Sequence, residues 1–290
     1  MTNILVTLNS TYLKPLKIML HSLFTNNPRR TFKVFIMHTN IKPNEIDSLE
    51  QFVNKNGNEL FSIQLDGNHF DDAPILMHYT KEMYFRLLAF KFLPKEMDRI
   101  LYLDPDILVL NPIDKLYEMD MGKHLFAAAS HEKISLKEIN RIRLLPYEID
   151  NYYNSGVLLM NLKEQRKIIN EEIILTFVEE NKKKLILPDQ DILNALYSKY
   201  IWNLEETIYN YDARYYNYYK LLSNHTIDMD YIINHTVFLH FCGKKKPWNS
   251  NYNGRFHALY KHYDKMTFRE DYKTGQEILQ PALKGNQSLL

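Results

Sequence analysis

Short apolar runs alternate with amphipathic stretches along the first part of the chain. Apolar runs at 3–8, 31–38 and 59–65 predict strands, and the spacing of apolar positions at 12–24 and 43–53 predicts helices. This alternation is typical of a mostly parallel sheet with helices on both faces. We therefore predict an α/β fold whose ligand cleft lies at the carboxyl ends of the strands.

The same pattern continues toward the C-terminus. It predicts helices at 81–92, 164–180 and 189–200, and strands at 99–103, 107–110, 125–129, 154–161 and 236–241. Residues 131–153 are polar, mixed in charge and weakly periodic, which predicts an excursion over the sheet that serves as a lid. Because the sequence contains no repeat and no Gly/Ser-rich linker, we predict one domain over 1–263 and a C-terminal extension over 264–290.

The composition limits the classes of partner. With 290 residues, 45% of them hydrophobic, the chain can bury a large core. Its 36 basic and 35 acidic residues give a formal net charge of +1, so no general attraction to nucleic acid is expected. The single cysteine, Cys242, excludes an internal disulfide and suits a reducing compartment. No basic leader precedes the first strand and no apolar run approaches the roughly 18 residues that span a bilayer, so we expect a cytoplasmic location.

Two carboxylates follow the apolar run at 99–103. Side chains alternate along an extended segment, so Asp104 and Asp106 are expected on one side, and Pro105 marks the end of the strand because it cannot donate to a sheet ladder. Two anions this close favour a hard divalent cation, Mg²⁺ or Mn²⁺, whose usual task is to neutralise a substrate phosphate. Asp-x-Asp recurs at 189–191 and 228–230, so it is the position after a strand, and not the motif alone, that favours a metal site.

A strand that ends in His240 runs directly into a segment with a glycine and three lysines. Gly243 permits close approach of the backbone to a phosphate, lysines such as Lys246 balance the phosphate charge, and an imidazole is a typical metal ligand beside carboxylates. Each feature alone is more often structural, because lysine runs are commonly solvated. Together with Asp104 and Asp106 they predict one site for a metal and a diphosphate.

Three other polar residues have both a structural and a functional interpretation. Asn154 opens a predicted strand and is an ordinary turn residue or a ligand contact. Asp189 follows Pro188 and is typical of a helix N-cap. Arg86 either pairs with a carboxylate or reaches the cleft, and spacing does not separate the two.

Taken in order, these features resemble the retaining glycosyltransferases of family 8, which include glycogenin and bacterial lipopolysaccharide galactosyl- and glucosyltransferases. The resemblance runs from Asn3 to Trp248 and is carried by Arg86 and the segments LNSTY (8–12), LYLDPDILVL (101–110), NSGVLLMNL (154–162), LPDQDILN (187–194) and HFCGKKKPW (240–248). It implies a Rossmann-like GT-A fold, a UDP-sugar donor, Mn²⁺ with Mg²⁺ as the alternative, and transfer that retains the anomeric configuration.

The resemblance also implies roles for single residues. Asp104, Asp106 and His240 match the metal-binding positions, and Gly243 and Lys246 match the diphosphate-binding ones. Leu8, Asn9 and Tyr12 fall in the uracil-binding segment, where Tyr12 matches the stacking residue and Asn9 replaces an aspartate common in relatives. His78 and Arg86 fall near the phosphates and the donor sugar. Asn154, Asp189 and Gln190 match donor-sugar contacts, with Gln190 on the reacting face.

The chemistry of a retaining transfer is consistent with this set. Breaking the bond between the anomeric carbon and UDP leaves charge on the diphosphate, which a metal and Lys246 would stabilise. Because an uncharged amide is a poor nucleophile, Gln190 favours front-side attack, in which the departing phosphate takes the acceptor proton, over a covalent intermediate on a side chain such as Asp189.

Two other function classes explain part of the pattern. A haloacid-dehalogenase-like phosphohydrolase also places Asp-x-Asp after an apolar strand, but it gives the HFCGKKKPW segment no role. A catalytically silent nucleotide-sugar-binding protein keeps the same cleft, although the intact series of site residues argues against lost turnover. The tyrosine-rich stretch at 209–219 favours aromatic core packing over a sugar-stacking platform.

Several properties stay open on the sequence. They are the choice between UDP-galactose and UDP-glucose, the acceptor, which is a saccharide or a glycolipid, the oligomeric state, and peripheral contact with the inner face of the membrane.

Overall fold

The computed structural model describes residues 1–65, 82–130, 142–147, 149 and 151–269. The strands are β1 (Thr2–Thr7), β2 (Phe32–His38), β3 (Glu59–Gln64), β4 (Arg99–Leu103), β5 (Ile107–Val109), β6 (Phe126–Ala129), β7 (Val157–Asn161), β8 (Ile201–Leu204), β9 (Tyr211–Asp212) and β10 (Phe238–His240). The helices are α1 (Leu13–Asn26), α2 (Pro43–Lys55), α3 (Glu82–Phe92), α4 (Asp114–Tyr117), α6 (Leu162–Ile168), α7 (Glu171–Asn181), α8 (Pro188–Tyr197), α9 (Glu206–Tyr209), α10 (Tyr216–Leu222), α11 (Met229–His235) and α12 (His257–Thr267).

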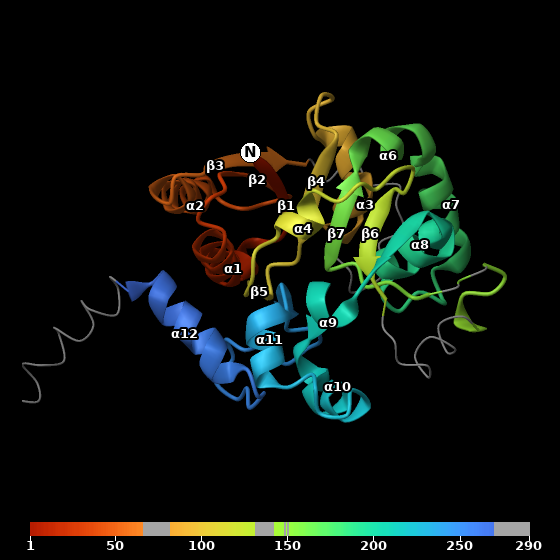
Figure 1. The fold of residues 1–290 in the computed structure, drawn as a ribbon. Helices are drawn as coiled ribbons and strands as arrows, with labels where there is room; N and C mark the ends of the chain where they lie inside the picture. The colour runs from red at the N-terminus through yellow and green to blue at the C-terminus, as the bar shows by residue number, and fades with distance from the viewer. Residues whose placement is uncertain (66–81, 131–141, 148, 150, 270–290) are drawn as a thin grey trace, which may run out of the picture.

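Seven strands form one sheet in the order β3-β2-β1-β4-β7-β6-β8 (Figure 1). All neighbouring pairs are parallel except those of β7, which runs antiparallel to both β4 and β6. The predicted mostly parallel sheet is therefore confirmed. Because β7 is reversed, its N-terminal end lies at the same edge of the sheet as the carboxyl end of β4.

The large sheet is buried on both faces. Along β4, Ile100 and Tyr102 pack into one apolar cluster, and Leu101 and Leu103 pack into another. Side chains of α3, α7 and α8 join the first cluster, and side chains of α1 and α2 join the second. Helices thus cover both faces, as the alternating pattern predicts.

A small sheet, β5-β10-β9, connects the large sheet to the C-terminal helices. Figure 1 shows α9, α10, α11 and α12 grouped on one side of the large sheet. Tyr211, Tyr216 and Tyr219 are buried there together with Phe256 and Tyr260. Core packing is therefore confirmed for these three tyrosines, whereas Tyr209, Tyr215 and Tyr218 of the same stretch are only partly buried.

The predicted single helix at 164–180 is wrong. The chain leaves α6 at Ile169, whose backbone is extended, and the Asn170 side chain accepts a hydrogen bond from the Glu172 backbone N–H to cap α7. The amphipathic spacing continues through this break, so periodicity alone joined two helices into one. The predicted helix at 189–200 likewise ends earlier, at Tyr197, and continues as a short 3-10 turn, Ser198–Tyr200.

Three predictions fall partly or wholly outside the described residues. His78 lies outside them, as does much of the predicted lid at 131–153. The predicted domain boundary after residue 263 falls inside α12, and residues 270–290 are not described, so the division into domain and extension stays a prediction. Among the described helices, none combines the length and the apolar character needed to cross a bilayer.

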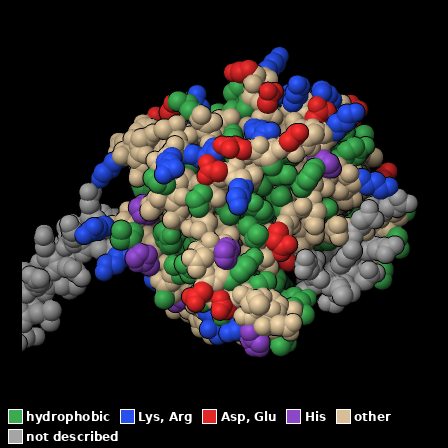
Figure 2. All heavy atoms as spheres, in the orientation of Figure 1, with side chains coloured by type: hydrophobic (Ala, Val, Ile, Leu, Met, Phe, Trp, Pro, Cys, Tyr) green, Lys and Arg blue, Asp and Glu red, His purple; other side chains and the backbone are tan. Residues whose placement is uncertain are grey.

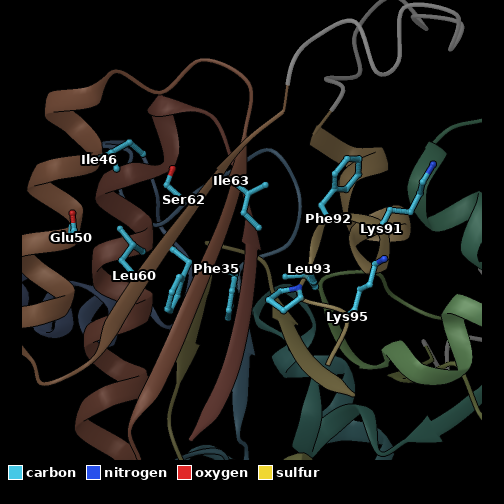
Figure 3. A pocket seen from close by; sticks show the side chains of 12 residues that line it. Phe35, Ile46, Glu50, Leu60, Ser62, Ile63, Lys91, Phe92, Leu93 and Lys95 are labelled. Atoms are coloured by element: carbon cyan, nitrogen blue, oxygen red, sulfur yellow. The ribbon is translucent and has the colours of Figure 1, made fainter. Parts of the chain in front are cut away.

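The surface does not carry one dominant charge on the face that Figure 1 presents. Figure 2 shows acidic and basic side chains interspersed there, in keeping with the net charge of +1. Figure 3 shows a hollow between the edge strand β3 and the end of α3, lined by Leu60, Ile63, Phe92 and Lys95 among others. None of the predicted site residues that the structure describes lines this hollow, so it is separate from the candidate site.

Candidate metal centre and cleft

Two strand pairings bring the predicted metal ligands together. Asp104 directly follows β4, and Asp106 directly precedes β5, whose antiparallel partner β10 places His240 opposite Ile107. His240 Nε2 lies 3.2 Å from Asp106 Oδ1 and 3.8 Å from Asp104 Oδ2. One ligand atom from each of the three residues lies within 4.8 Å of the others. Residues more than 130 positions apart in the sequence thus form the predicted cluster.

Two cations face this cluster. Lys246 Nζ contacts Asp106 Oδ2 and also donates to the Phe241 carbonyl at 3.0 Å. Arg86 Nη1 lies 3.2 Å from Asp104 Oδ1. Burial alone raises the pKa of the Asp106 carboxyl, but His240 and Lys246 outweigh burial and hold that pKa below its ordinary value. Asp106 is therefore a carboxylate in the folded protein, as a metal ligand must be.

A chain of hydrogen bonds fixes which nitrogen of His240 carries its proton. The Gly156 backbone N–H donates at 2.8 Å, so the Asn154 atom that it meets is the amide oxygen. Asn210 Nδ2 donates to that same oxygen at 2.8 Å, which turns Asn210 Oδ1 toward His240 Nδ1 at 2.9 Å. Nδ1 must therefore carry a hydrogen, and Nε2 is the atom that faces the two carboxylates.

This arrangement is that of a metal-ligating histidine. Burial disfavours a charged imidazole, but Cys242 and Asp106 outweigh it and raise the pKa of His240. The Nδ1–H···Oδ1 bond is compatible with both the neutral and the protonated ring, so Nε2 is the nitrogen that would give up its proton to hold a metal. Two carboxylates and one oriented imidazole nitrogen are a donor set that fits a divalent metal ion.

Replacing Asn210 with leucine is expected to weaken Mn²⁺ binding by about 10- to 100-fold, because the ring of His240 loses the acceptor that orients it. Titration followed by electron paramagnetic resonance measures the affinity, and ¹⁵N chemical shifts of His240 in the metal-free protein, recorded at a pH where the ring is neutral, report the tautomer. Asn44→Leu, on the exposed face of α2, is the matched control. An unchanged affinity and tautomer in Asn210→Leu would show that Asn210 only fills space.

A second group of polar residues lies beside the metal ligands. Arg86 Nη1 is 3.2 Å from Asp189 Oδ2 as well as from Asp104, and it donates to the Ser155 carbonyl at 3.1 Å. The Ser155 hydroxyl donates to Asp189 Oδ2 at 2.8 Å, and the Ser155 N–H donates to Gln190 Oε1 at 3.4 Å. Arg86 thus joins the two parts of the site, which answers the question that spacing left open.

The N-cap interpretation of Asp189 is wrong. Leu187 occupies the N-cap position of α8, and Asp189 lies inside the helix with its carboxylate turned to Arg86 and Ser155. It is Asp191 that accepts the N–H groups of Ile186 and Leu187, at 2.8 and 3.1 Å. Burial raises the pKa of the Asp189 carboxyl, although Arg86 and Ser155 oppose this effect.

The predicted nucleotide contacts differ in what their side chains can reach. Leu8 is only 3% exposed, its side chain packs in the core, and its backbone N–H donates to the Met37 carbonyl at 3.2 Å. Asn9 accepts from the Thr11 N–H at 3.1 Å and caps the 3-10 turn at Ser10–Tyr12. The ring of Tyr12 lies edge-on to Trp248, with centroids 5.8 Å apart. Their contact with a nucleotide stays a prediction.

Two glycines allow neighbouring groups to approach the backbone closely at this site. A Cβ on Gly156 would lie 2.4 Å from His240 Cε1 and 2.7 Å from Asp104 Oδ2. Gly243 has a φ of +84°, a backbone conformation that other residues rarely adopt. The sequence predicts Gly243 as a site residue, but not Gly156, Ser155 or Asn210. Ser155 and Gly156 nevertheless belong to the segment NSG before an apolar run, which is typical of a turn.

The similarity to known proteins extends over most of the chain. The model of glycosyl transferase family 8 matches residues 3–252. General stress protein A of Bacillus subtilis (strain 168) is 31% identical over 268 residues, which are 88% of this chain and 90% of that protein. Lipopolysaccharide 1,2-glucosyltransferase of Escherichia coli (strain K12) is 24% identical over 258 residues, 85% of this chain and 72% of that protein.

A solved structure has the same fold. The galactosyltransferase LgtC, crystallised in complex with donor and acceptor sugar analogs, superposes with a TM-score of 0.77 at 22% identity, over 91% of this chain and 96% of that one. The predicted GT-A architecture is thereby confirmed.

Proposed function

The chain belongs to glycosyl transferase family 8, and we propose that it transfers a hexose from a UDP-sugar to a saccharide or glycolipid acceptor with retention of the anomeric configuration. The observation that supports this best is the cluster of Asp104, Asp106 and His240 with Lys246 and Arg86 beside it. Three potential metal ligands and two cations converge at the strand ends, where a diphosphate needs both kinds of group.

The groups on the donor side can stabilise the negative charge that develops on the leaving diphosphate. When bound, a divalent ion would neutralise negative charge on the diphosphate as a Lewis acid. Mn²⁺ fits the mixed carboxylate and imidazole donor set better than Mg²⁺, which prefers oxygen ligands. Lys246 supplies a second positive charge from the opposite side of Asp106, and Gly243 gives a phosphate access to the backbone.

The reacting sugar is assigned to the part of the cleft around Gln190. The Gln190 side chain is 5% exposed, and among the described residues its amide meets a single long hydrogen bond, from the Ser155 N–H, so little holds it against turning toward a ligand. Asp189 is held by Arg86 and Ser155, a role in orientation that also suits contact with sugar hydroxyls. We assign Gln190 the stabilisation of the oxocarbenium-like state in a front-side attack.

Gln190→Ala is expected to lower kcat by about 100-fold while UDP affinity changes by less than about threefold, because the side chain acts on the reacting sugar and not on the nucleotide. Steady-state kinetics and calorimetric titration of UDP give the two numbers. Gln51→Ala, exposed on α2, controls for loss of an amide elsewhere. Equal losses in kcat and in UDP binding would assign Gln190 a positional role, and a sugar trapped on a side chain would overturn the front-side route.

The family match bears on one of the two alternative functions, and an experiment is needed for the other. The phosphohydrolase finds no support, because the family model spans residues 3–252 and includes the His240 segment. Release of UDP from a UDP-sugar distinguishes an enzyme from a catalytically silent binding protein. Screening UDP-galactose and UDP-glucose for Mn²⁺-stimulated hydrolysis tests the proposed function directly: one donor should be consumed, and consumption of neither would contradict the proposal.

The biological setting is proposed from relatives. Since several of the curated relatives are named as lipopolysaccharide glucosyl- or galactosyltransferases, we propose a role in synthesis of a cell-surface polysaccharide or glycolipid. A cytoplasmic location with peripheral contact at the inner face of the membrane stays a prediction.

A further inference from the structure

A second cavity, of about 360 Å³, lies behind the loop that carries Lys246. No acidic residue that the structure describes lines it. Its lining includes four basic side chains and two tyrosines, namely Arg214, Lys244, Lys245, Arg255, Tyr216 and Tyr252. We propose that this basic cavity binds an anionic group, a phosphate or carboxylate, on the acceptor saccharide. The inference rests on the proposed function and names the class of acceptor that the function leaves open.

Arg214 is held rigidly at one wall of the cavity. Asp212, fully buried, accepts from Arg214 Nε at 3.0 Å and from Nη2 at 2.6 Å. This pairing leaves Nη1 with no hydrogen-bond acceptor among the described residues. A Cβ on Gly243 would lie 2.8 Å from that Nη1, so the glycine is what lets the guanidinium pack directly against the loop.

Arg255 is fixed in a different way at another wall. Its guanidinium stacks over the ring of Tyr216, 4.4 Å from the centroid. Stacking holds the planar group while its N–H donors stay at the edge, the geometry with which arginine binds phosphate and carboxylate in a bidentate manner. Within the described part of the chain, no carboxylate pairs with Arg255.

The cavity has an excess of positive charge. Lys244 and Lys245 are exposed, and neither makes an ion pair with a described residue, so Asp212 is the single described carboxylate that pairs with any of the four cations. Tyr252 also lines the cavity, and its hydroxyl would lie 2.1 Å from a Cβ on Gly254, so the ring packs closely against the backbone there. Fixed cations in a concave site attract an anion more strongly than scattered surface lysines do.

The position of the cavity points to the acceptor and not to the donor. Lys246 turns toward Asp106, on the side of the metal ligands, whereas Lys244 and Lys245 of the same loop line the cavity. The donor diphosphate is accounted for by Lys246 and the metal site. Cys242 and Gly243 also line the cavity, and Cys242 interacts with His240, so the cavity adjoins the metal centre. An anion held there is assigned to the second substrate, because Lys246 and the metal ligands face the donor diphosphate. A cavity of this size accommodates a sugar with one charged substituent.

The test compares glucose 6-phosphate with glucose as probes, each titrated into protein saturated with UDP and Mn²⁺ and followed by NMR. Glucose 6-phosphate is expected to bind at least about tenfold more tightly than glucose, because the charged group gains charge-assisted hydrogen bonds. The Lys245→Ala/Arg255→Ala double variant should lose this difference, and Arg255→Lys should lose part of it because the charge stays but the planar fork is gone. Lys163→Ala, exposed on α6, should keep it.

Three results would overturn the inference. They are equal affinities for the two probes, an unchanged preference in the double variant, and inorganic phosphate binding as tightly as glucose 6-phosphate, since the cavity would then recognise a free anion. Binding of UDP and Mn²⁺ to the wild-type protein, measured in the same samples, tests the proposed function separately.

Discussion

Asp106→Asn is expected to lower metal-dependent turnover of the UDP-sugar at least about a thousandfold, because it removes one negative charge and one ligand from the centre that stabilises the leaving group. The substitution keeps the volume of the side chain, and Asp106 contacts His240 and Lys246 through the two oxygens that the change affects. The loss should therefore fall on metal binding and kcat, while the fold is retained. Turnover with saturating Mn²⁺, Mn²⁺ affinity and the thermal unfolding midpoint give the three readouts.

The sequence offers a matched control for this variant. Asp230 belongs to another Asp-x-Asp, at 228–230, lies exposed on α11 and is not part of the cluster. Asp230→Asn should keep both turnover and Mn²⁺ affinity. An Asp106→Asn protein that turns over at the wild-type rate would remove Asp106 from the metal site.

Arg86→Met is expected to lower the free energy of unfolding by about 3–5 kcal/mol, because it leaves buried carboxylates without their cation. Arg86 is 8% exposed, it lies 3.2 Å from both Asp104 and Asp189, and its guanidinium also stacks over Tyr102 at 4.5 Å. Methionine keeps most of the volume, so the cost is largely electrostatic. Urea unfolding in the absence of metal measures it, with the exposed Arg29→Met as control.

The loss in Arg86→Met should grow with pH. Burial already raises the pKa of Asp189 above its ordinary value, and Arg86 opposes that rise. Without Arg86 the folded-state pKa is higher still, so stability is retained below the unfolded value, about 4, and is lost as pH rises through the folded-state pKa. The difference from wild type should be larger at pH 8 than at pH 5. Asp189→Asn in the same chain should reduce this pH dependence, and a loss equal at both pH values would contradict the charge-pairing role.

The local pattern was sufficient to predict most elements of the fold. The strands at the start of the chain and the Asp104 strand are short apolar runs bounded by turn residues, and such signals depend on neighbouring residues only. The break at Ile169 and Asn170 was missed although Asn170 before two glutamates is itself a capping signal. The reversed direction of β7 has no local signal, because it depends on which strand β7 pairs with.

In the candidate site too, some residues can be identified from the sequence and others only from the folded chain. Asp104, Asp106 and His240 were recognisable from residue types and their positions at strand ends, and the structure brings them together. Asn210 was not recognisable, because its role comes from contacts with Asn154 and His240, 56 and 30 positions away. The requirement for glycine at 156 likewise comes from side chains that only the folded chain places there.

The most direct test is an anomalous difference map at the manganese edge, from crystals of this protein grown with UDP and Mn²⁺. We predict one strong peak within coordination distance of Asp104, Asp106 and His240 Nε2, with the diphosphate of UDP on the same ion and Lys246 beside it. A peak elsewhere, or His240 turned away from an ion held by the two aspartates, would contradict the metal centre described here.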